Sequence, residues 1–304
     1  MFDAVVIGGG PAGLTAVLYL VRSGCRVLLC ESMTYGGQVL QTADIANYPG
    51  FPKGVKGWEL ADLFSAHVEG LDFARKTCEV LSISGSAGSF CVHTSDGDVD
   101  AKTVLVCTGA VHRPLGVEGE LRLKGHGVSY CAVCDGNFFR NQPVAVVGGG
   151  NSALEEALYL SKIASKVYLV HRRGAFRGAK VYQDRVLQAQ NIELVLSSVV
   201  DSLIGESELE GVVVSNVEDG SKRTLDVNGL FIFVGMQPNS GFVPQEVAAD
   251  HGFIVTDTEM RTSVPGIFAA GDVRAKLCRQ VITAAGDGAT AAQAAFLLLE
   301  QLNA

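Results

Sequence analysis

The feature that most constrains this chain is a glycine-rich motif that follows an apolar strand and leads into an apolar-periodic helix. Residues 4–7 form the apolar run, and the chain continues as Gly8-x-Gly10-x-x-Gly13. After the helix, a second apolar run ends at Glu31. In this order the glycines allow a tight turn and close approach of the backbone to a pyrophosphate, and the acid binds a ribose hydroxyl. The segment is therefore predicted to bind a dinucleotide rather than to be a plain strand-to-helix turn.

The motif occurs again 140 positions further along the chain, as Gly148-x-Gly150-x-x-Ala153. The strand after this second helix ends in basic residues rather than an acid, namely His171, Arg172 and Arg173, with Arg177 four residues further on. Arginine offers paired donors to a 2′-phosphate, which a carboxylate would repel. We expect this unit to bind NADPH in preference to NADH, the alternative being a solvated basic loop.

The repetition extends over a whole domain in each half of the chain. Each motif is followed by a β-rich stretch that closes on a glycine, Gly109 in the first half and Gly235 in the second. Two units with different residues after the second strand imply two different dinucleotides. An enzyme that holds FAD and NADPH transfers hydride.

The C-terminal part of the chain has no glycine motif of its own. An apolar strand there ends at Gly271-Asp272, where the carboxylate can accept hydrogen bonds from ligand hydroxyls or cap a helix. We predict an α/β fold with two Rossmann-like, three-layer dinucleotide-binding domains, the second inserted into the first. Residues 1–113 and 244–304 are expected to form a discontinuous FAD-binding domain, and residues 114–243 the NADPH-binding domain.

Charge and hydropathy exclude several classes of protein. With 32 acidic and 24 basic residues the chain has a net charge of −8, which argues against a broad nucleic-acid-binding surface. The longest uncharged run, residues 4–21, approaches the length of a membrane span, but the glycine motif interrupts it. The N-terminus lacks the basic segment that begins a secretory signal. We therefore expect a cytoplasmic protein with no membrane association.

One close pair stands out among the eight cysteines, Cys131-Ala132-Val133-Cys134. Two intervening residues allow a small disulfide ring, and this spacing lowers the pKa of one thiol so that it attacks as a thiolate. Asp135 is placed to exchange the proton. The competing interpretation is a zinc site, but there is no second CxxC and the nearest histidine, His126, is isolated. We expect no metal here, and we expect the other six cysteines to be packed as small apolar residues.

The chain resembles the low-molecular-weight thioredoxin reductases over essentially its whole length. The resemblance rests on the two glycine motifs, the CxxC pair with Asp135, and further segments, namely Gly36-Gly37-Gln38, Asn47-Tyr48-Pro49-Gly50, Gly271-Asp272 and Arg279-Gln280. It implies a homodimer with an FAD domain, an inserted NADPH domain that carries the dithiol, and thioredoxin or a thioredoxin-like protein as partner. By the same resemblance Cys134 is the cysteine nearer the flavin, Cys131 attacks the thioredoxin disulfide, and Asp135 acts as the acid.

The resemblance also implies the cofactor contacts. For FAD these are Gly8, Gly10, Pro11, Ala12, Gly13, Glu31, Ser32, Gly36, Gly37, Gln38, Asn47, Val80, Thr108, Gly109, Ala110, Gly271, Asp272, Arg279, Gln280 and Val281. For NADPH they are Gly148, Gly150, Asn151, Ser152, Ala153, Glu155, His171, Arg172, Arg173 and Arg177.

Three alternatives stay open. One is a flavin-dependent reductase of another small redox protein, and another is an electron-transfer flavoprotein similar to ferredoxin–NADP reductase, which would have no use for the dithiol. The third is a binding module without enzymatic activity.

Overall fold

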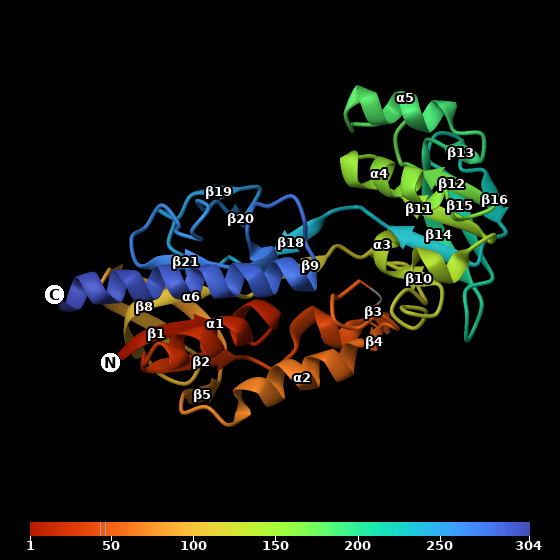
Figure 1. Ribbon diagram of the computed structural model, residues 1–304. Helices are drawn as coiled ribbons and strands as arrows, with labels where there is room; N and C mark the ends of the chain where they lie inside the picture. The colour runs from red at the N-terminus through yellow and green to blue at the C-terminus, as the bar shows by residue number, and fades with distance from the viewer. Residues whose placement is uncertain (43, 46) are drawn as a thin grey trace. The chain divides into compact units, whose positions relative to one another are not determined.

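A computed structural model describes residues 1–304 except 43 and 46. The chain divides into two compact units, Met1–Val111 with Gln237–Ala304 (unit 1) and His112–Met236 (unit 2), drawn in Figure 1. The predicted boundaries lay at 113/114 and 243/244. Residues 112–113 therefore belong to unit 2 and not to unit 1, and residues 237–243 belong to unit 1 and not to unit 2. Backbone hydrogen bonds give the reason. Within unit 1, Asn239 N–H donates to the carbonyl of Gly109, and within unit 2, Arg113 N–H donates to the carbonyl of Gly235.

Unit 1 is built on one seven-stranded sheet. Its parallel strands are β5 (Ala74–Thr77), β2 (Val27–Glu31), β1 (Phe2–Ile7), β8 (Val99–Val106) and β21 (Ile267–Ala269), in that order across the sheet. The antiparallel strands β6 (Val80–Ser86) and β7 (Ser89–Thr94) extend the sheet beside the first half of β8. The helices of this unit are α1 (Pro11–Arg22), α2 (Gly57–Glu69) and α6 (Val281–Asn303).

Short elements complete unit 1 and the crossings between the units. They are η1 (Gly37–Gln41), β3 (Asp44–Ile45), β4 (Val55–Lys56), β9 (Ala110–His112), β18 (Met236–Pro238), β19 (Ala249–Asp250), β20 (Phe253–Ile254) and η3 (Gly271–Val273). The crossing strands β9 and β18 pair with each other.

Unit 2 repeats the parallel plan on a smaller scale. Its main sheet has the order β10 (Val128–Ser129), β17 (Gly229–Ile232), β11 (Pro143–Val147), β12 (Lys166–Val170) and β13 (Ile192–Val195). An antiparallel sheet of β14 (Ser198–Ile204), β15 (Gly211–Asn216) and β16 (Lys222–Leu225) accompanies it. The helices are α3 (Ala132–Asp135), η2 (Gly136–Phe139), α4 (Asn151–Leu160) and α5 (Lys180–Gln188).

The strand that leads into each glycine motif shows how the cores form. In β1, Ala4 and Val6 pack into one apolar cluster and Val5 and Ile7 into another on the opposite face. In β11 the residues of 144–147 alternate between two clusters in the same way. Successive strand residues point to opposite faces, so a continuous apolar run is buried on both sides. The predicted three-layer α/β architecture with two Rossmann-like units is confirmed.

Helix α6 is long and apolar enough to cross a bilayer by length and composition alone. Core helices pass the same test, and α6 lies along α1 (Figure 1). At Gly288 a Cβ would lie 2.1 Å from the carbonyl oxygen of Ala12, so the two backbones touch. The next turns of α6 bury Ala291, Ala292 and Ala295. The apolar composition of this helix therefore serves close packing inside unit 1.

Candidate functional site

The first glycine turn is imposed by close backbone packing. Gly8 has a φ of +104°, and a Cβ there would lie 2.5 Å from the carbonyl oxygen of Cys107. A Cβ on Gly13 would lie 1.8 Å from the carbonyl oxygen of Gly8. Helix α1 begins at Pro11 after Gly10, which has no side chain to cap it. The first N–H groups of α1 are therefore left for a ligand with negative charge.

Glu31, at the end of β2, turns its carboxylate toward this glycine turn. Oε2 accepts a hydrogen bond from the N–H of Gly9 at 2.7 Å, and Oε1 accepts one from the N–H of Met33 at 2.9 Å. These bonds fix the orientation of the carboxylate. Because an ionised carboxylate has about four lone-pair sites, Glu31 keeps acceptor capacity for the hydroxyls of a ligand.

A cavity of ≈ 640 Å³ lies over these features in unit 1. Its volume is within the range of small-molecule sites, about 300–1,000 Å³. Most of the residues predicted to bind FAD line it, namely Gly8, Gly10, Pro11, Ala12, Glu31, Ser32, Gly37, Gln38, Val80, Thr108, Gly109, Ala110, Gly271 and Asp272.

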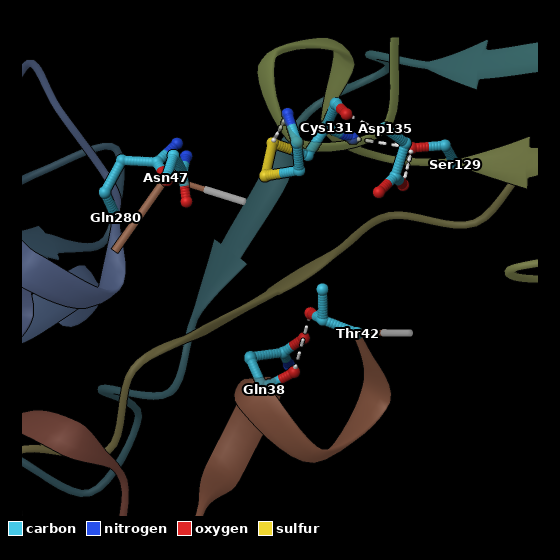
Figure 2. Close-up of a disulfide and its surroundings, with 8 residues drawn as sticks. Gln38, Thr42, Asn47, Ser129, Cys131, Asp135 and Gln280 are labelled. Atoms are coloured by element: carbon cyan, nitrogen blue, oxygen red, sulfur yellow. Dashed lines mark hydrogen bonds between the residues drawn. A yellow bond between two sulfur atoms is a disulfide. The ribbon is translucent and has the colours of Figure 1, made fainter. Parts of the chain in front are cut away.

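The other residues predicted for FAD lie outside the lining of this cavity, namely Gly13, Gly36, Asn47, Arg279, Gln280 and Val281. Gly13 and Gly36 act through packing, since a Cβ on Gly36 would lie 2.7 Å from the Cβ of Ala61. The Asn47 side-chain amide donates to Gln280 Oε1 at 3.0 Å (Figure 2). These two side chains are therefore held together just before α6.

Several lining residues escaped prediction. They are Ile7, Gly9, Cys30, Met33, Thr34, Leu40, Cys78, Glu79, Cys107, Asn239, Phe242 and Ala284. Most are residue types that commonly pack in cores, so nothing in the sequence distinguishes them. Ala284 could have been predicted to line the site, because it belongs to the run of small residues that opens the last helix.

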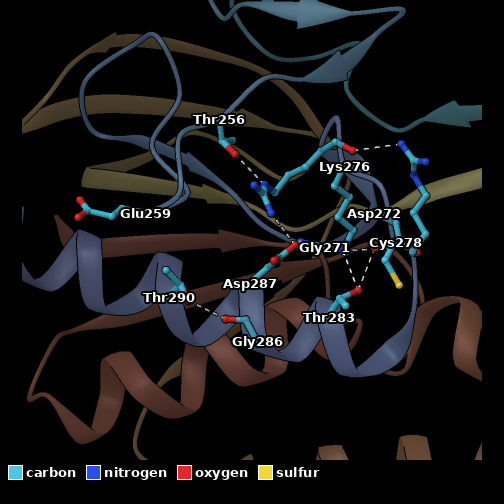
Figure 3. A network of polar contacts seen from close by, with 12 residues as sticks. Thr256, Glu259, Gly271, Asp272, Lys276, Cys278, Thr283, Gly286, Asp287 and Thr290 are labelled. Carbon is cyan, nitrogen blue, oxygen red and sulfur yellow. Dashed lines mark hydrogen bonds and ion pairs between the residues drawn. The ribbon is translucent and has the colours of Figure 1, made fainter. Parts of the chain in front are cut away.

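A network of charged groups supports the Gly271-Asp272 corner (Figure 3). Asp287 of α6 accepts hydrogen bonds from Gly271 N–H and Lys276 Nζ, both at 3.1 Å, and pairs with Arg274 at 2.9 Å. Lys276 Nζ also lies 3.2 Å from Asp272 Oδ1. Neither Lys276 nor Asp287 was predicted. The sequence nevertheless marks Asp287 as unusual, since it is the one charged residue in the apolar stretch 281–299.

Asp272 keeps a buried acceptor for a ligand. Its Oδ1 has no hydrogen-bond partner of good geometry among the described residues, although the Lys276 ammonium is close. Burial raises the pKa of the Asp272 carboxyl, and Lys276 and Arg279 oppose that shift. Burial likewise lowers the pKa of Arg279, whose guanidinium lies 4.2 Å from the centre of the Phe253 ring. A buried acceptor facing the cavity is suited to a hydroxyl donor.

The second glycine turn, in unit 2, is closed by a loop that follows β12. Gly148 has a φ of +153° and would place a Cβ 2.5 Å from the carbonyl oxygen of Phe233. The N–H groups of Arg177 and Gly178 donate to the carbonyl of Gly149 at 2.8 and 3.1 Å. The tertiary structure thus brings Arg177 to the turn beside the N-terminus of α4.

Asn151 and the first residues of α4 complete this site. Asn151 Oδ1 accepts a hydrogen bond from Ala179 N–H at 2.7 Å, which fixes the closing loop. Ser152 and Glu155 are exposed on α4, and Ala153 is buried under the turn. Like Gly13 in unit 1, Ala153 is packed against the glycine turn.

The basic residues after β12 divide into two roles. His171 is only 5 % exposed, and a Cβ on Gly149 would lie 2.2 Å from its ring. Burial lowers the pKa of His171, and the neighbouring arginines lower it further. His171 therefore supports the turn from below, whereas Arg172, Arg173 and Arg177 are exposed and free to reach a phosphate.

Cys131 and Cys134 form a disulfide in unit 2, with their Cα atoms 5.3 Å apart. The N–H of Cys134 donates to Cys131 Sγ at 3.2 Å. Ser129 is a partner that the sequence analysis missed: its hydroxyl donates to Asp135 Oδ2 at 2.6 Å and accepts from Cys131 N–H at 3.1 Å (Figure 2). Asp135 is thereby oriented beside the disulfide. The bonded sulfurs are the oxidised form of the CxxC dithiol.

Comparison with known proteins agrees with this arrangement. Residues 2–288 match the family described as pyridine nucleotide-disulphide oxidoreductase. The thioredoxin reductase of Listeria monocytogenes is 42% identical over 307 residues, covering 100% of this chain and 95% of that protein. The thioredoxin reductase of Treponema pallidum is 41% identical over 302 residues, covering 99% of this chain and 98% of that protein.

A solved structure extends the similarity to the fold. The crystal structure of thioredoxin reductase from Streptococcus pyogenes has 44% sequence identity and a TM-score of 0.92, covering 99% of both chains. The family match, the near-complete coverage and the disulfide with its two nucleotide turns agree with one another. This chain belongs to the pyridine nucleotide-disulphide oxidoreductases and, within them, to the thioredoxin reductases.

Proposed function

We propose that unit 1 holds FAD, that unit 2 binds NADPH, and that Cys131 and Cys134 deliver the electrons to the disulfide of thioredoxin. Members of this family contain FAD and use NADPH. The observation that carries the proposal is the Cys131–Cys134 disulfide in the same unit as an arginine-ended nucleotide turn. A dithiol in a chain with a nicotinamide site is suited to thiol–disulfide exchange.

The residues of the unit 1 cavity fit FAD. The start of α1 offers uncapped N–H groups for a pyrophosphate, and Glu31 offers a fixed carboxylate for a ribose. Asp272 offers a buried carboxylate, paired with Lys276, whose Oδ1 accepts no hydrogen bond of good geometry from the described residues, which suits a further hydroxyl. When bound, FAD supplies the two-electron chemistry that links a nicotinamide to a disulfide.

The unit 2 turn fits NADPH. Gly148 and Gly150 allow close approach of a pyrophosphate to the start of α4, where Ser152 is exposed. The exposed guanidinium groups of Arg172, Arg173 and Arg177 are available as donors to a 2′-phosphate. His171 would keep Arg172 and Arg173 in place by filling the space under Gly149.

The dithiol carries out the exchange with thioredoxin. In the reduced enzyme the Cys131 thiolate attacks one sulfur of the thioredoxin disulfide, and the other thioredoxin sulfur leaves as a thiolate that takes a proton. Cys134 then attacks Cys131 Sγ, which releases reduced thioredoxin and restores the Cys131–Cys134 disulfide. Asp135, oriented by Ser129, is the residue placed to move the proton. Val133 and Phe138 are exposed apolar side chains near the pair that a protein substrate can cover.

A coupled assay tests the proposal. With NADPH and oxidised thioredoxin, the purified flavoprotein is expected to release thioredoxin thiols that react with a chromogenic disulfide, and NADH should be a much poorer donor. Ferredoxin is the control acceptor. Rapid NADPH oxidation with ferredoxin but not with thioredoxin would instead identify the electron-transfer alternative.

The family resemblance also leads us to propose a homodimer and a cytoplasmic location. Light scattering coupled to size-exclusion chromatography tests the first, with twice the 31.9 kDa chain mass expected. Fractionation of cells that express the protein tests the second.

A further inference from the structure

A cluster of three potential metal ligands lies in unit 1, apart from the cavity described above. Cys91 and His93 are on β7, and Asp98 is in the turn between β7 and β8. Cys91 and His93 are separated by one residue on a strand, so their side chains point to the same face of the sheet. The turn brings Asp98 to that face. One atom from each residue lies within 4.8 Å of the other two.

The distances within the cluster are close to those between ligands of one ion. Cys91 Sγ lies 3.8 Å from His93 Nδ1, and His93 Nδ1 lies 3.0 Å from Asp98 Oδ1. Tetrahedral zinc has Zn–S bonds of about 2.3 Å and Zn–N and Zn–O bonds of about 2.0–2.2 Å, which place its ligands about 3.4–3.6 Å apart. The observed distances differ from these by a few tenths of an ångström.

The histidine is oriented by a neighbour in the way that metal-bound histidines are. Its other ring nitrogen, Nε2, lies 2.9 Å from the hydroxyl of Ser84 on β6. Ser84 pairs with Cys91 in the β6–β7 register, so it belongs to the same local surface. In the tautomer in which Nε2 donates its proton to the Ser84 hydroxyl, Nδ1 is the ligand atom.

The arrangement is not that of a nucleophilic triad. In a triad the nucleophile and the acid contact opposite nitrogens of the imidazole ring. Here Cys91 and Asp98 both lie next to Nδ1, and the opposite nitrogen faces Ser84. When Nε2 carries the ring proton, the Cys91 thiol, the Asp98 carboxylate and the Nδ1 lone pair surround a single point in space. That point is suited to a cation.

We propose that Cys91, His93 and Asp98 bind one Zn²⁺ ion through Sγ, Nδ1 and Oδ1. A thiolate and an imidazole select zinc over magnesium or calcium, which prefer shells of oxygen ligands. Binding releases the Cys91 thiol proton to solvent as the S–Zn bond forms. Water or Asp100, which pairs with Cys91 in the β7–β8 register, completes the fourth position.

Exposure and charge favour entry of the ion. The side chain of Asp98 is 61% exposed and that of His93 is 36% exposed. Asp98 and Asp100 add to the effect of burial in raising the pKa of the Cys91 thiol. A bound cation would oppose the effect of Asp98 and Asp100 on the Cys91 thiol. The bound ion would join β7 to the following turn and shield Cys91 from oxidation.

The test is zinc binding by the oxidised holoenzyme, in which Cys131 and Cys134 are not available as thiolates. The protein is stripped with a chelator and desalted, and then titrated calorimetrically with ZnCl₂, with bound zinc counted by mass spectrometry. We expect one zinc per chain, not displaced by excess Mg²⁺. Cys91→Ser and His93→Gln should each weaken binding at least tenfold, and Ser84→Ala about tenfold through loss of the second hydrogen bond.

Two control variants match the site in chemistry but not in geometry. Cys278→Ser removes an exposed free thiol, and His251→Gln removes an exposed histidine 3.8 Å from a carboxylate. Both should bind zinc as the wild type does. The bound-flavin spectrum shows which variants fold.

A second measurement needs no variant. Zinc should protect Cys91 but not Cys278 from alkylation, read by peptide mass spectrometry. Zinc binding that is absent in the wild type, unchanged in Cys91→Ser and His93→Gln, or without effect on Cys91 alkylation would overturn the proposal. None of these outcomes depends on thioredoxin reduction.

Discussion

The two nucleotide turns share one backbone plan and differ in the direction taken by the side chains after the second strand. In unit 1 the carboxylate of Glu31 turns inward and accepts hydrogen bonds from Gly9 and Met33. In unit 2 the corresponding segment buries His171 and leaves Arg172 and Arg173 exposed. The same frame therefore presents acceptors in one unit and donors in the other.

The turns also differ in how closely the helix approaches the strand. In unit 1 the third motif residue is Gly13, where a Cβ would lie 1.8 Å from the carbonyl oxygen of Gly8. In unit 2 the same place holds Ala153, which is fully buried. The difference shows that α1 packs more tightly on its turn than α4 does. Chemistry and packing thus separate two copies of one motif.

The largest expected effect concerns the dithiol, which lies in unit 2. Cys131→Ser should lower thioredoxin reduction by at least about 10³-fold, because the nucleophile is removed. NADPH oxidation with an artificial acceptor should continue, as followed by absorbance. The control is Cys25→Ser, which removes a half-buried cysteine between α1 and β2. Thioredoxin turnover above a tenth of the wild-type rate would be incompatible with the dithiol relay.

The next effect concerns the donors of unit 2. Replacing both Arg172 and Arg173 with alanine should raise the KM for NADPH roughly 10- to 100-fold, since hydrogen bonds between charged groups contribute about 1.5–3 kcal/mol. The KM for NADH should change little. Steady-state kinetics with both donors measures this, and Arg185→Ala on α5 is the matched exposed control. An equal rise for both nucleotides would mean that these arginines do not read the 2′-phosphate.

The packing difference gives a reciprocal pair of variants. Gly13→Ala should destabilise unit 1 by about 1–3 kcal/mol, because the new methyl group overpacks the turn, and the purified protein should retain less FAD. Ala153→Gly should cost only about 0.5–1 kcal/mol, the usual effect of glycine within a helix. Thermal unfolding and flavin content measure both. A milder effect for Gly13→Ala than for Ala153→Gly would contradict the comparison.

The smallest effect concerns the residue three positions after the motif in α1 and α4, one helical turn further along. Unit 1 has the fully buried Ala16 where unit 2 has Glu156, whose Oε2 is buried without a partner among the described residues. Burial, with help from Glu155, raises the pKa of Glu156 to about 7. The unfolded chain loses this proton near pH 4.5 and the folded chain near pH 7, so the carboxyl increasingly opposes folding as the pH rises between these values.

Glu156→Gln should therefore raise the melting temperature at pH 8 and have little effect at pH 4.5. Differential scanning calorimetry at the two pH values measures this, and Glu300→Gln on the exposed side of α6 is the control. The same shift at both pH values would show that the carboxyl does not titrate in this range.

Much of the fold and site was predictable because it depends on local residue order. Each glycine turn joins a strand to a helix as predicted, and Glu31 and the exposed arginines follow the second strand of their own unit. The CxxC pair is local by its spacing alone. His171 stays a predicted NADPH contact, and only the tertiary structure shows that it is buried, against Gly149 of the turn. The unit boundaries moved because Asn239 bonds back to Gly109, a contact that sequence spacing does not reveal.

The sequence by itself determined the two-unit α/β plan, the acceptor and donor ends of the two turns, and the redox pair. Local sterics and hydrophobic period decide these features, and both can be read from neighbouring residues. Only the tertiary structure decided that Asp287 supports Gly271, that Ser129 orients Asp135, and that Cys91, His93 and Asp98 lie close together. Asp287 on α6 contacts Gly271 on the turn after β21, 16 residues away in the chain. The contacts of Ser129 with Asp135 and of Asp98 with His93 depend on where backbone turns direct the side chains. The pattern of apolar residues sets which elements form, but not which polar groups meet.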